Sequence, residues 1–468
     1  MNKFFTFKKK KYKHIDFISS LSEYIPKIKN PSYVCKHGFY PFIGNEIIFK
    51  KYCKQIDGNT LKHYSKKCRP IKYASHIDSL IYQWYSYKLN EKYNVYAVEN
   101  GFNGCSVAYR TCFHGKCSIN FAKSAIDFIK TCGDCYILVS DFSNFFDKID
   151  HKILKENLKR VLGVSKLSED WFKVYKSMTR YCYINKCDIE KYLVDKKIET
   201  EKTIRVNKCL FENILWNEAK KDLKEYINDG VNKNNYGIPQ GASLSGIFAN
   251  VFMIDFDYKM SLFVKNNDGF YMRYSDDIIV VVPCNKILSI QELWNQVCFC
   301  KDKLSNLEIN KSKTCCYRFV NNSINSLHEY MDGFKKSPNF ISFLGFSFDG
   351  SFVKFRDKTI IKFYYKIYRK IDSMVKRERI RLLKGKKRKS KIDKHYVLKK
   401  LKKSKENIRF ANYLFRTKKV FVGEKFIQKF DKNIKNKVFN RFNKQMHKFN
   451  IKWFIIFLII CYNISNIL

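Results

Sequence analysis

Two short apolar runs in the sequence carry acidic residues where a strand would end. The run CYILVSDF (135–142) reaches Asp141, and the run FYMRYSDDIIVVV (270–282) contains the adjacent pair Asp276 and Asp277. Both runs are rich in β-branched and aromatic residues, which predicts strands, and the Ser-Asp unit in the second predicts a hairpin with both carboxylates at its turn. Because Asp is also common in turns for local hydrogen bonding, this pair alone does not indicate catalysis.

The chemistry changes if the two runs form adjacent strands, because Asp141 would then lie beside Asp276. Two carboxylates about 4 Å apart repel by about 4 kcal/mol at an effective dielectric constant near 20. A fold tolerates such a cluster when a cation neutralises it, and Mg²⁺ suits oxygen ligands completed by substrate phosphates. Two such ions stabilise the attacking 3′-hydroxyl and the leaving pyrophosphate in nucleotide polymerisation. The sequence therefore predicts two Mg²⁺ ions, with Mn²⁺ as a candidate substitute.

The composition independently favours a polyanionic partner. The chain has 90 Lys and Arg against 43 Asp and Glu, which gives a formal charge of +47. Nucleic acid is the commonest polyanion that a basic protein binds, although a biased codon usage rich in Lys would produce the same excess. The 45% hydrophobic and 16% aromatic content excludes a wholly disordered chain, and 468 residues suggest two to four lobes.

Cysteine usage and the termini bear on the compartment. Seventeen cysteines and an N-terminus without a signal-peptide pattern predict a reducing, cytoplasmic environment. Cys132 and Cys135 have zinc-like spacing, but no second pair lies at a matching distance in the sequence, so we expect buried thiols there. The apolar run Trp453–Tyr462 has ten residues, about half of a membrane-spanning helix, and predicts a docked helix or strand without a membrane partner, with a weak membrane or partner anchor as the alternative.

The remaining pattern predicts the α+β class. Ile119, Ala122, Ala125, Ile126 and Ile129 follow helical spacing. A third strand signal, FISFLGFSF (340–348), joins the two acidic runs in a mixed lobe. From about 355 to 450 Pro and Gly nearly vanish while Lys and Arg alternate with aromatic residues, which indicates a basic helical lobe.

Several motifs occur in the order found in reverse transcriptases, and together they make the chain resemble that family over about residues 65–350. They are DFSNFFDKI (141–149), the Pro-Gln-Gly segment Tyr236–Asp257, YSDD (274–277), LEINKSKT (307–314) and FLGF (343–346). Upstream, Arg69-Pro70-Ile71 and Ala108-Tyr109-Arg110 are similar to the family's fingers segments. The resemblance implies an RNA-directed DNA polymerase, a nucleotidyltransferase.

The resemblance also implies a right-hand polymerase fold with fingers, an RRM-like palm of antiparallel sheet plus helices, and a helical thumb. The expected divisions are a basic N-terminal extension (1–60), fingers (61–134), palm (135–350), thumb (351–450) and apolar tail (451–468). A helical segment at about 155–230 would be inserted in the palm.

Roles at the site follow from the same resemblance. Asp141 and Asp276 would bridge the metals, with Asp277 in support and the Phe142 carbonyl as a further ligand. Phe146 would lie under the sugar and select deoxynucleotides. The other candidates are Gln240 and Gly241 for template and nucleotide, Lys72, Arg110 and Lys313 for phosphates, and Phe343, Leu344 and Gly345 for the primer grip. Viewed singly, each of these has an ordinary structural or solvated role as its alternative.

Within the family, the sequences of the fingers segments and of the segment that follows the primer grip look most like those of bacterial defence-associated reverse transcriptases of the unknown-group and abortive-infection type. Retron and group II intron enzymes share the palm motifs and remain alternatives. The implied partners are an RNA template, which could be a dedicated noncoding RNA, a DNA primer or product, and dNTPs. A second defence protein or another copy of the chain are further candidates. Template-independent or protein-primed synthesis, and a non-enzymatic RNA-binding scaffold, are the competing functions.

Overall fold

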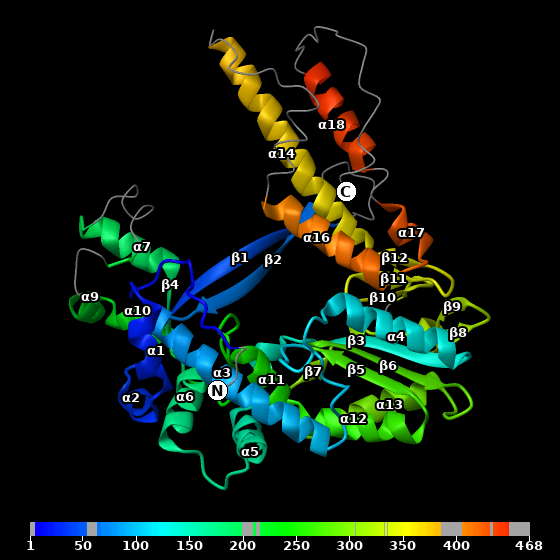
Figure 1. Cartoon of the computed structure of the whole chain (residues 1–468), viewed down its shortest axis with the longest axis horizontal. Coiled ribbons are helices and arrows are strands. Elements are labelled where there is room, and N and C mark those ends of the chain that lie inside the picture. Colours follow the sequence, from blue (N-terminus) through cyan, green and yellow to red (C-terminus); the bar gives the residue numbers. More distant parts are fainter. Residues whose placement is uncertain are drawn as a thin grey trace. The chain divides into compact units, whose positions relative to one another are not determined.

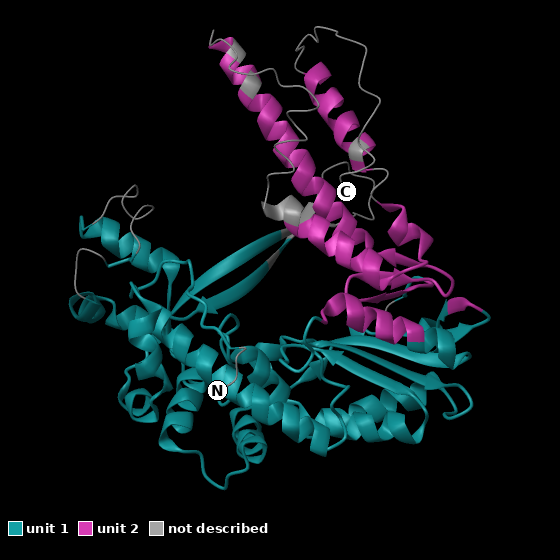
Figure 2. Ribbon diagram, viewed as in Figure 1, with its two compact units in different colours: residues 1–115, 128–321, 325–338 teal, residues 116–127, 322–324, 339–468 magenta. Residues whose placement is uncertain are grey.

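The computed structural model describes residues 5–53, 63–198, 209–211, 216–304, 306–331, 333–334, 336–384, 405–430 and 434–448. The chain forms two compact units (Figure 2). The first comprises residues 1–115, 128–321 and 325–338, and the second residues 116–127, 322–324 and 339–468. Helices and an antiparallel sheet occur together, which confirms the predicted α+β class.

The main sheet has the strand order β5-β6-β3-β8-β9, and a short strand, β7, also pairs with β3; all of its strands except the start of β9 belong to the first unit. Its strands are β3 (Cys135–Ser143), β5 (Phe270–Tyr274), β6 (Asp277–Pro283), β7 (Glu308–Ile309), β8 (Cys315–Val320) and β9 (Ser323–Ser326). The β3 strand pairs antiparallel with β6, β7 and β8. Helices α12 (Ile254–Asn266) and α13 (Ile290–Lys301) pack against this sheet (Figure 1). The two acidic runs are therefore neighbouring strands, which is the condition on which the expected carboxylate cluster depended.

A helical layer in the same unit surrounds the long helix α3. Its helices are α3 (His76–Glu99), α5 (His151–Leu162), α6 (Glu169–Thr179) and α11 (Ser245–Phe252). The α3, α5 and α11 helices pack on one another, and Tyr82, Tyr85 and Tyr93 of α3 are buried in the core. The Ser75 hydroxyl accepts a hydrogen bond from the Asp78 N–H and so caps α3 at its start.

The N-terminal residues fold into this unit, which differs from the predicted basic extension over 1–60. Helices α1 (Leu21–Lys29) and α2 (Pro31–Lys36) pack against α3 and α6, and Phe7, Ile18 and Ile28 are buried in the same core. In α1, Leu21, Tyr24, Ile25 and Ile28 follow helical spacing and face this core, so the sequence carried a signal for a packed helix that the prediction of an extension did not use.

A second, smaller core lies beside a three-stranded sheet of order β2-β1-β4. Strands β1 (Phe42–Cys53) and β2 (His63–Tyr73) form an antiparallel pair, and β4 (Tyr183–Asn185) pairs parallel with β1. Helices α7 (Lys186–Asp195), α9 (Trp216–Asp222) and α10 (Lys224–Asp229) complete this region. The described residues between 155 and 230 form helices and one strand, β4.

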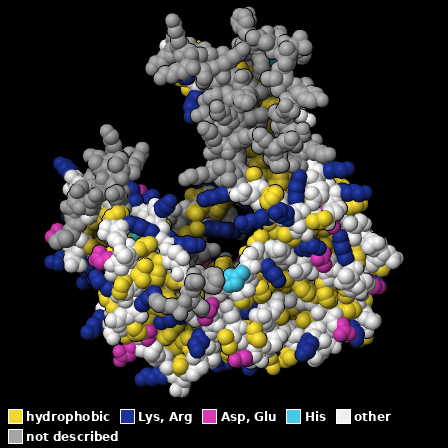
Figure 3. Space-filling model, viewed as in Figure 1, with side chains coloured by type: hydrophobic (Ala, Val, Ile, Leu, Met, Phe, Trp, Pro, Cys, Tyr) yellow, Lys and Arg dark blue, Asp and Glu magenta, His cyan; other side chains and the backbone are white. Residues whose placement is uncertain are grey.

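The second unit combines a small sheet with basic helices. Its elements include β10 (Ile341–Phe343), β11 (Phe346–Phe348), β12 (Val353–Phe355), α14 (Asp357–Leu383), α16 (Lys405–Val420), α17 (Lys425–Gln428) and α18 (Ile434–Lys448). The α14 and α18 helices pair through buried Ile371, Val375, Val438 and Phe442. Lys and Arg side chains are spread over much of the face that Figure 3 shows.

The segment FISFLGFSF forms two strands rather than one. Leu344 (φ 45°) and Gly345 (φ 95°) both have left-handed backbone and make the turn between β10 and β11. A two-residue turn with positive φ at both positions matches the twist of a hairpin, and Leu344 is an unusual residue for it. Gly345 is the only residue in this run that is typical of turns, so the apolar pattern did not predict the turn between the two strands.

The predicted helix around residues 119–129 is confirmed as α4 (Ser118–Cys132), with Ile119, Ala122, Ala125 and Ile129 buried. The apolar tail 451–468 lies outside the described residues. Within the described ranges, no helix combines the length and apolarity needed to cross a membrane.

The central sheet should dominate the stability of the first unit. Leu138 on β3 is fully buried, whereas Leu288 is 94% exposed. We expect Leu138→Ala to lower the free energy of unfolding by about 2–5 kcal/mol, because it leaves a cavity, and Leu288→Ala to change it by less than about 0.5 kcal/mol. Urea denaturation followed by circular dichroism measures both, and equal losses in the two variants would contradict this placement.

Candidate active site

Three acidic residues come together in the strand register where the β5–β6 hairpin pairs with the end of β3. Asp141 lies directly opposite Asp277 in the β3–β6 ladder, and the Phe142 N–H donates to the Asp276 carbonyl at 3.1 Å. Directly opposed residues have Cβ atoms about 4.5–5.5 Å apart. The prediction that Asp141 lies beside the hairpin pair agrees with this register, although its cross-strand partner is Asp277 and not Asp276.

The β5–β6 turn determines which residues of the hairpin lie opposite each other. Tyr274 pairs with Asp277, so Ser275 and Asp276 are the two central residues of the hairpin. Ser275 has φ 62°, a left-handed backbone that residues other than Gly seldom adopt. Such strained positions cost roughly 1–3 kcal/mol and persist only where surrounding contacts fix them.

A buried ion pair supplies those contacts. Arg273 is completely buried, and its guanidinium donates to both carboxylate oxygens of Asp257, at 2.8 and 2.6 Å. The same guanidinium donates to the Ser275 carbonyl at 3.0 Å. Tyr271 donates its hydroxyl to Asp257 at 2.7 Å. The pair therefore links α12 to the strained turn that carries Asp276.

Sequence reasoning missed this pair. The available signal was a charged residue, Arg273, in the middle of an otherwise apolar strand, and Asp257 on a mostly apolar helix. Buried charges are nearly always paired, so each residue called for a partner, but the sequence did not say which.

The two oxygens of Asp141 have different surroundings. Its Oδ2 lies 2.6 Å from the Lys313 Nζ, and its Oδ1 is buried without a hydrogen-bond partner. Lys313 ends the short 3₁₀ helix η2 (Lys311–Lys313), and the Asn310 N–H donates to the Asp141 carbonyl at 3.0 Å. The structure therefore pairs Lys313 with Asp141, while the sequence analysis had assigned Lys313 to phosphates.

This oxygen-rich site matches the chemistry of Mg²⁺. A buried carboxylate oxygen without a partner is costly, and a hard cation would satisfy it. Within the described ranges, no group of three or more acidic, His or Cys side chains is arranged to hold a metal ion. The cation that the structure does show at Asp141 is the Lys313 ammonium, so an ion binding at Oδ2 would compete with it.

The Pro-Gln-Gly loop meets the edge of β2. The Lys72 N–H donates to the Gln240 carbonyl at 2.9 Å, and Gly241 has φ 128°. A Cβ on Gly241 would lie 2.6 Å from the Lys72 carbonyl oxygen. Glycine is therefore required here by close backbone approach as well as by conformation, whichever ligand the loop contacts.

Lys72 and Arg110, the two fingers cations, are both largely buried. The Lys72 Nζ lies over the rings of Tyr181 (5.2 Å) and Tyr183 (4.8 Å). Burial lowers the pKa of Lys72, and the charge of Asp147 acts in the opposite direction. The charges of Lys72 and Asp147 therefore act on each other.

Arg110 differs from its predicted role. It is 8% exposed, and its guanidinium donates to Asn94, Asn103 and Ser106. These contacts hold the segment after α3 and leave the side chain directed into the protein. A triphosphate contact would require it to leave them.

The aromatic and primer-grip candidates are placed as follows. Phe142 is buried against Phe256, with ring centroids 5.5 Å apart, whereas Phe146 is half-buried beside Phe145. Phe343 is buried in β10 of the second unit, and the turn residues Leu344 and Gly345 are partly exposed. The structure thus leaves Phe146 accessible to a ligand and makes Phe142 a core residue.

Comparison with known proteins agrees with the motif order. The family described as reverse transcriptase (RNA-dependent DNA polymerase) matches residues 61–348. No curated protein sequence matches the chain.

Similar solved structures include telomerases of two yeasts, all at 13% identity. The C-terminally truncated apo telomerase of Candida tropicalis has a TM-score of 0.38, with 66% of this chain and 54% of that chain covered. Telomerase of Candida albicans in complex with a fragment of telomeric RNA has a TM-score of 0.37, with 92% and 65% covered. The chain spans about half to two thirds of the length of these telomerase chains.

The Arg273–Asp257 pair should be essential for the turn. We expect Asp257→Asn to lower the free energy of unfolding by about 3–5 kcal/mol, because it leaves Arg273 buried without its counter-ion. The matched change Asp134→Asn breaks a half-exposed pair with Arg318 and should cost at most about 1 kcal/mol. Urea denaturation of both variants checks this, and similar small losses would show that the buried pair does not hold the turn.

Proposed function

The chain belongs to the reverse transcriptase family, and we propose that it adds deoxynucleotides to a DNA 3′-hydroxyl along an RNA template. The observation that carries this proposal is Asp141, which lies opposite Asp277 and beside the Asp276 turn with one buried oxygen lacking a hydrogen-bond partner. Three acids at the end of one β ladder are unfavourable unless cations are bound during the reaction.

The proposed metal ligands are Asp141 and Asp276, with Asp277 in support and the Phe142 carbonyl as a further oxygen donor. When bound, two Mg²⁺ ions would stabilise the charge that develops on the attacking and leaving oxygens. Lys313 neutralises Asp141 before the ions arrive, and its side chain is about half exposed. Once released, its ammonium is available to the leaving phosphates through charge-assisted hydrogen bonds.

The surrounding residues would position the nucleotide and template. Gly241 lets the backbone of the Pro-Gln-Gly loop approach closely, and Gln240 presents an amide beside it. Lys72 adds positive charge at the adjoining edge of β2. Phe146 would pack under the sugar and exclude a 2′-hydroxyl. The primer-grip role of Phe343, Leu344 and Gly345 belongs to the same proposal.

The biological setting is a further part of the proposal. The sequences of the fingers segments and of the segment that follows the primer grip favour a bacterial antiphage defence enzyme over a retron or intron type. The template would be an RNA, the products DNA, and the large positive charge suits both. Cysteine-rich composition is compatible with a reducing cytoplasm.

Removing one metal ligand should stop synthesis without unfolding the chain. We expect Asp141→Asn and Asp276→Asn each to lower Mg²⁺-dependent dNTP incorporation by about 100-fold or more, equivalent to roughly 2.7 kcal/mol of transition-state stabilisation. The control Asp268→Asn changes an acid that is 70% exposed and paired with Lys286, and should retain activity. Primer extension on a defined RNA measures all three, and undiminished synthesis by the site variants would remove these acids from the mechanism.

The same assay separates templated from untemplated synthesis. A product complementary to the added RNA supports the proposed activity. A product of constant sequence whatever RNA is supplied, or one covalently attached to the protein, would instead support template-independent or protein-primed synthesis.

Sugar selection should depend on Phe146. We expect Phe146→Ala to raise the incorporation of ribonucleotides relative to deoxynucleotides by roughly tenfold or more, because a small side chain leaves space for the 2′-hydroxyl. The control Phe172→Ala changes a ring on α6 that is 44% exposed. Competition between rCTP and dCTP on one template gives the ratio, and an unchanged ratio would assign Phe146 to packing alone.

A further inference from the structure

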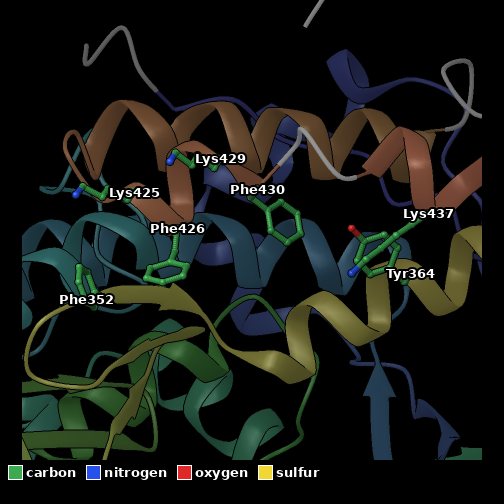
Figure 4. Close-up of a pocket in the computed structure, with 7 residues that line it drawn as sticks. All are labelled: Phe352, Tyr364, Lys425, Phe426, Lys429, Phe430 and Lys437. Atoms are coloured by element: carbon green, nitrogen blue, oxygen red, sulfur yellow. The ribbon is translucent and has the colours of Figure 1, made fainter.

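The second unit contains a pocket of about 410 Å³ that lies wholly within that unit (Figure 4). It is bounded by the residues before β12, the start of α14, the region of α17 and the start of α18. This volume falls within the range typical of small-ligand sites, about 300–1,000 Å³. None of the residues assigned to polymerisation lines it.

Aromatic rings form the body of the pocket. Phe352 and Phe426 are 42% and 50% exposed and pack edge to face, with centroids 5.4 Å apart. Phe430 lies between this pair and Tyr364 in Figure 4, and its centroid is 6.5 Å from that of Tyr364. The Lys354 Nζ lies 4.6 Å from the Phe426 ring centroid, so the surface on which a flat ring can stack consists of Phe352 and the part of Phe426 that Lys354 leaves exposed.

Lysines provide all of the charge in the lining. Lys425 and Lys429 come from α17 and the residue after it, and Lys437 comes from α18, where its Nζ lies 4.6 Å from the Tyr364 ring centroid. Among the described residues, none of the three has a carboxylate within 4.0 Å, and no acidic side chain lines the pocket. The nearby Asp349 is paired with Lys354, at 2.8 Å.

We propose that this pocket binds one nucleotide unit of a single-stranded nucleic acid. Its base would stack on the Phe352–Phe426 end, and its phosphates would contact Lys425 and Lys429. An uncompensated positive lining selects an anion, and the exposed rings select one with a flat apolar part. Bases within a duplex are already stacked, so the ligand is a single strand, for which aromatic platforms beside basic grooves are the usual solution.

The site adds to the proposed polymerase centre and does not depend on it. A single strand held here would tether an unpaired part of the template or product to the second unit. Binding needs neither dNTPs nor the acids of β3 and β6, so it can be tested in the full-length Asp141→Asn variant. Failure of the pocket and failure of the polymerase proposal are therefore distinguishable.

The test is binding of a fluorescent 12-nucleotide oligouridylate to the full-length chain, at roughly 200 mM salt so that non-specific phosphate contacts are weakened. One stacked base contributes enough that Phe426→Leu should weaken binding by roughly 5- to 150-fold. Phe415→Leu, which changes a ring on α16 that is 58% exposed, is the matched control and should leave binding unchanged. Equal affinities of the two variants would overturn the proposal.

Charge is tested separately. Lys425→Gln/Lys429→Gln should weaken single-strand binding more than Lys376→Gln/Lys384→Gln, which removes the same charge from one exposed position on α14 and from the exposed residue that follows it. Duplex RNA should bind both double variants equally. Equal loss of single-strand binding in the two double variants would indicate a diffuse charge effect and contradict a defined site.

Photocrosslinking identifies the occupant directly. Substituting 5-bromouridine into the same oligonucleotide should crosslink to peptides containing Phe352 or Phe426, and an excess of unlabelled strand should remove these crosslinks. Oligodeoxyuridylate distinguishes DNA from RNA, and free UMP distinguishes a strand from a mononucleotide. Crosslinks confined to other peptides would overturn the proposal, as would equal competition by polyglutamate, which would identify an acidic peptide site instead.

Discussion

Two carboxylates directly opposite each other at the end of a β ladder repel, and that repulsion is the constraint on which the site depends. Asp141 and Asp277 are fixed in this relation by the β3–β6 register, and the adjacent turn adds Asp276. The structure relieves part of the repulsion with the Lys313 ammonium but leaves the other Asp141 oxygen buried and unsatisfied. Cations that bind these acids, as the proposed mechanism requires, would relieve the remaining repulsion.

The rest of the first unit serves to hold that unfavourable arrangement. The buried core of β3 and β6 fixes the strands, and Arg273 fixes the left-handed Ser275 through its carbonyl. Because Arg273 is itself neutralised by Asp257 on α12, the position of the turn depends on helix packing behind the sheet. The edge of β2 approaches Gly241 so closely that no side chain fits there. Distant segments of the sequence thus meet at one end of the sheet.

Features governed by local pattern could be predicted from the sequence. The strand that carries Asp141, the hairpin that carries Asp276 and the helix α4 follow from periodicity and turn residues. Features that depend on which distant residue becomes the partner of a buried side chain could not be predicted. Arg273 and Asp257 are sixteen residues apart, and nothing in the sequence pairs them. Arg110 was expected to face solvent or phosphate, but the amides of Asn94 and Asn103 satisfy it inside the fold. The break at Leu344 depends on a conformation that its residue type does not favour.

The most direct test of the central claim is to locate the cations. Crystals of the full-length chain with Mn²⁺, a primer–template and a non-hydrolysable dNTP would show the metal positions by anomalous scattering. We expect Mn²⁺ bound to carboxylate oxygens of Asp141 and Asp276, with Lys313 displaced from Asp141. Metal peaks elsewhere, with the Lys313–Asp141 ion pair intact beside a bound nucleotide, would contradict it.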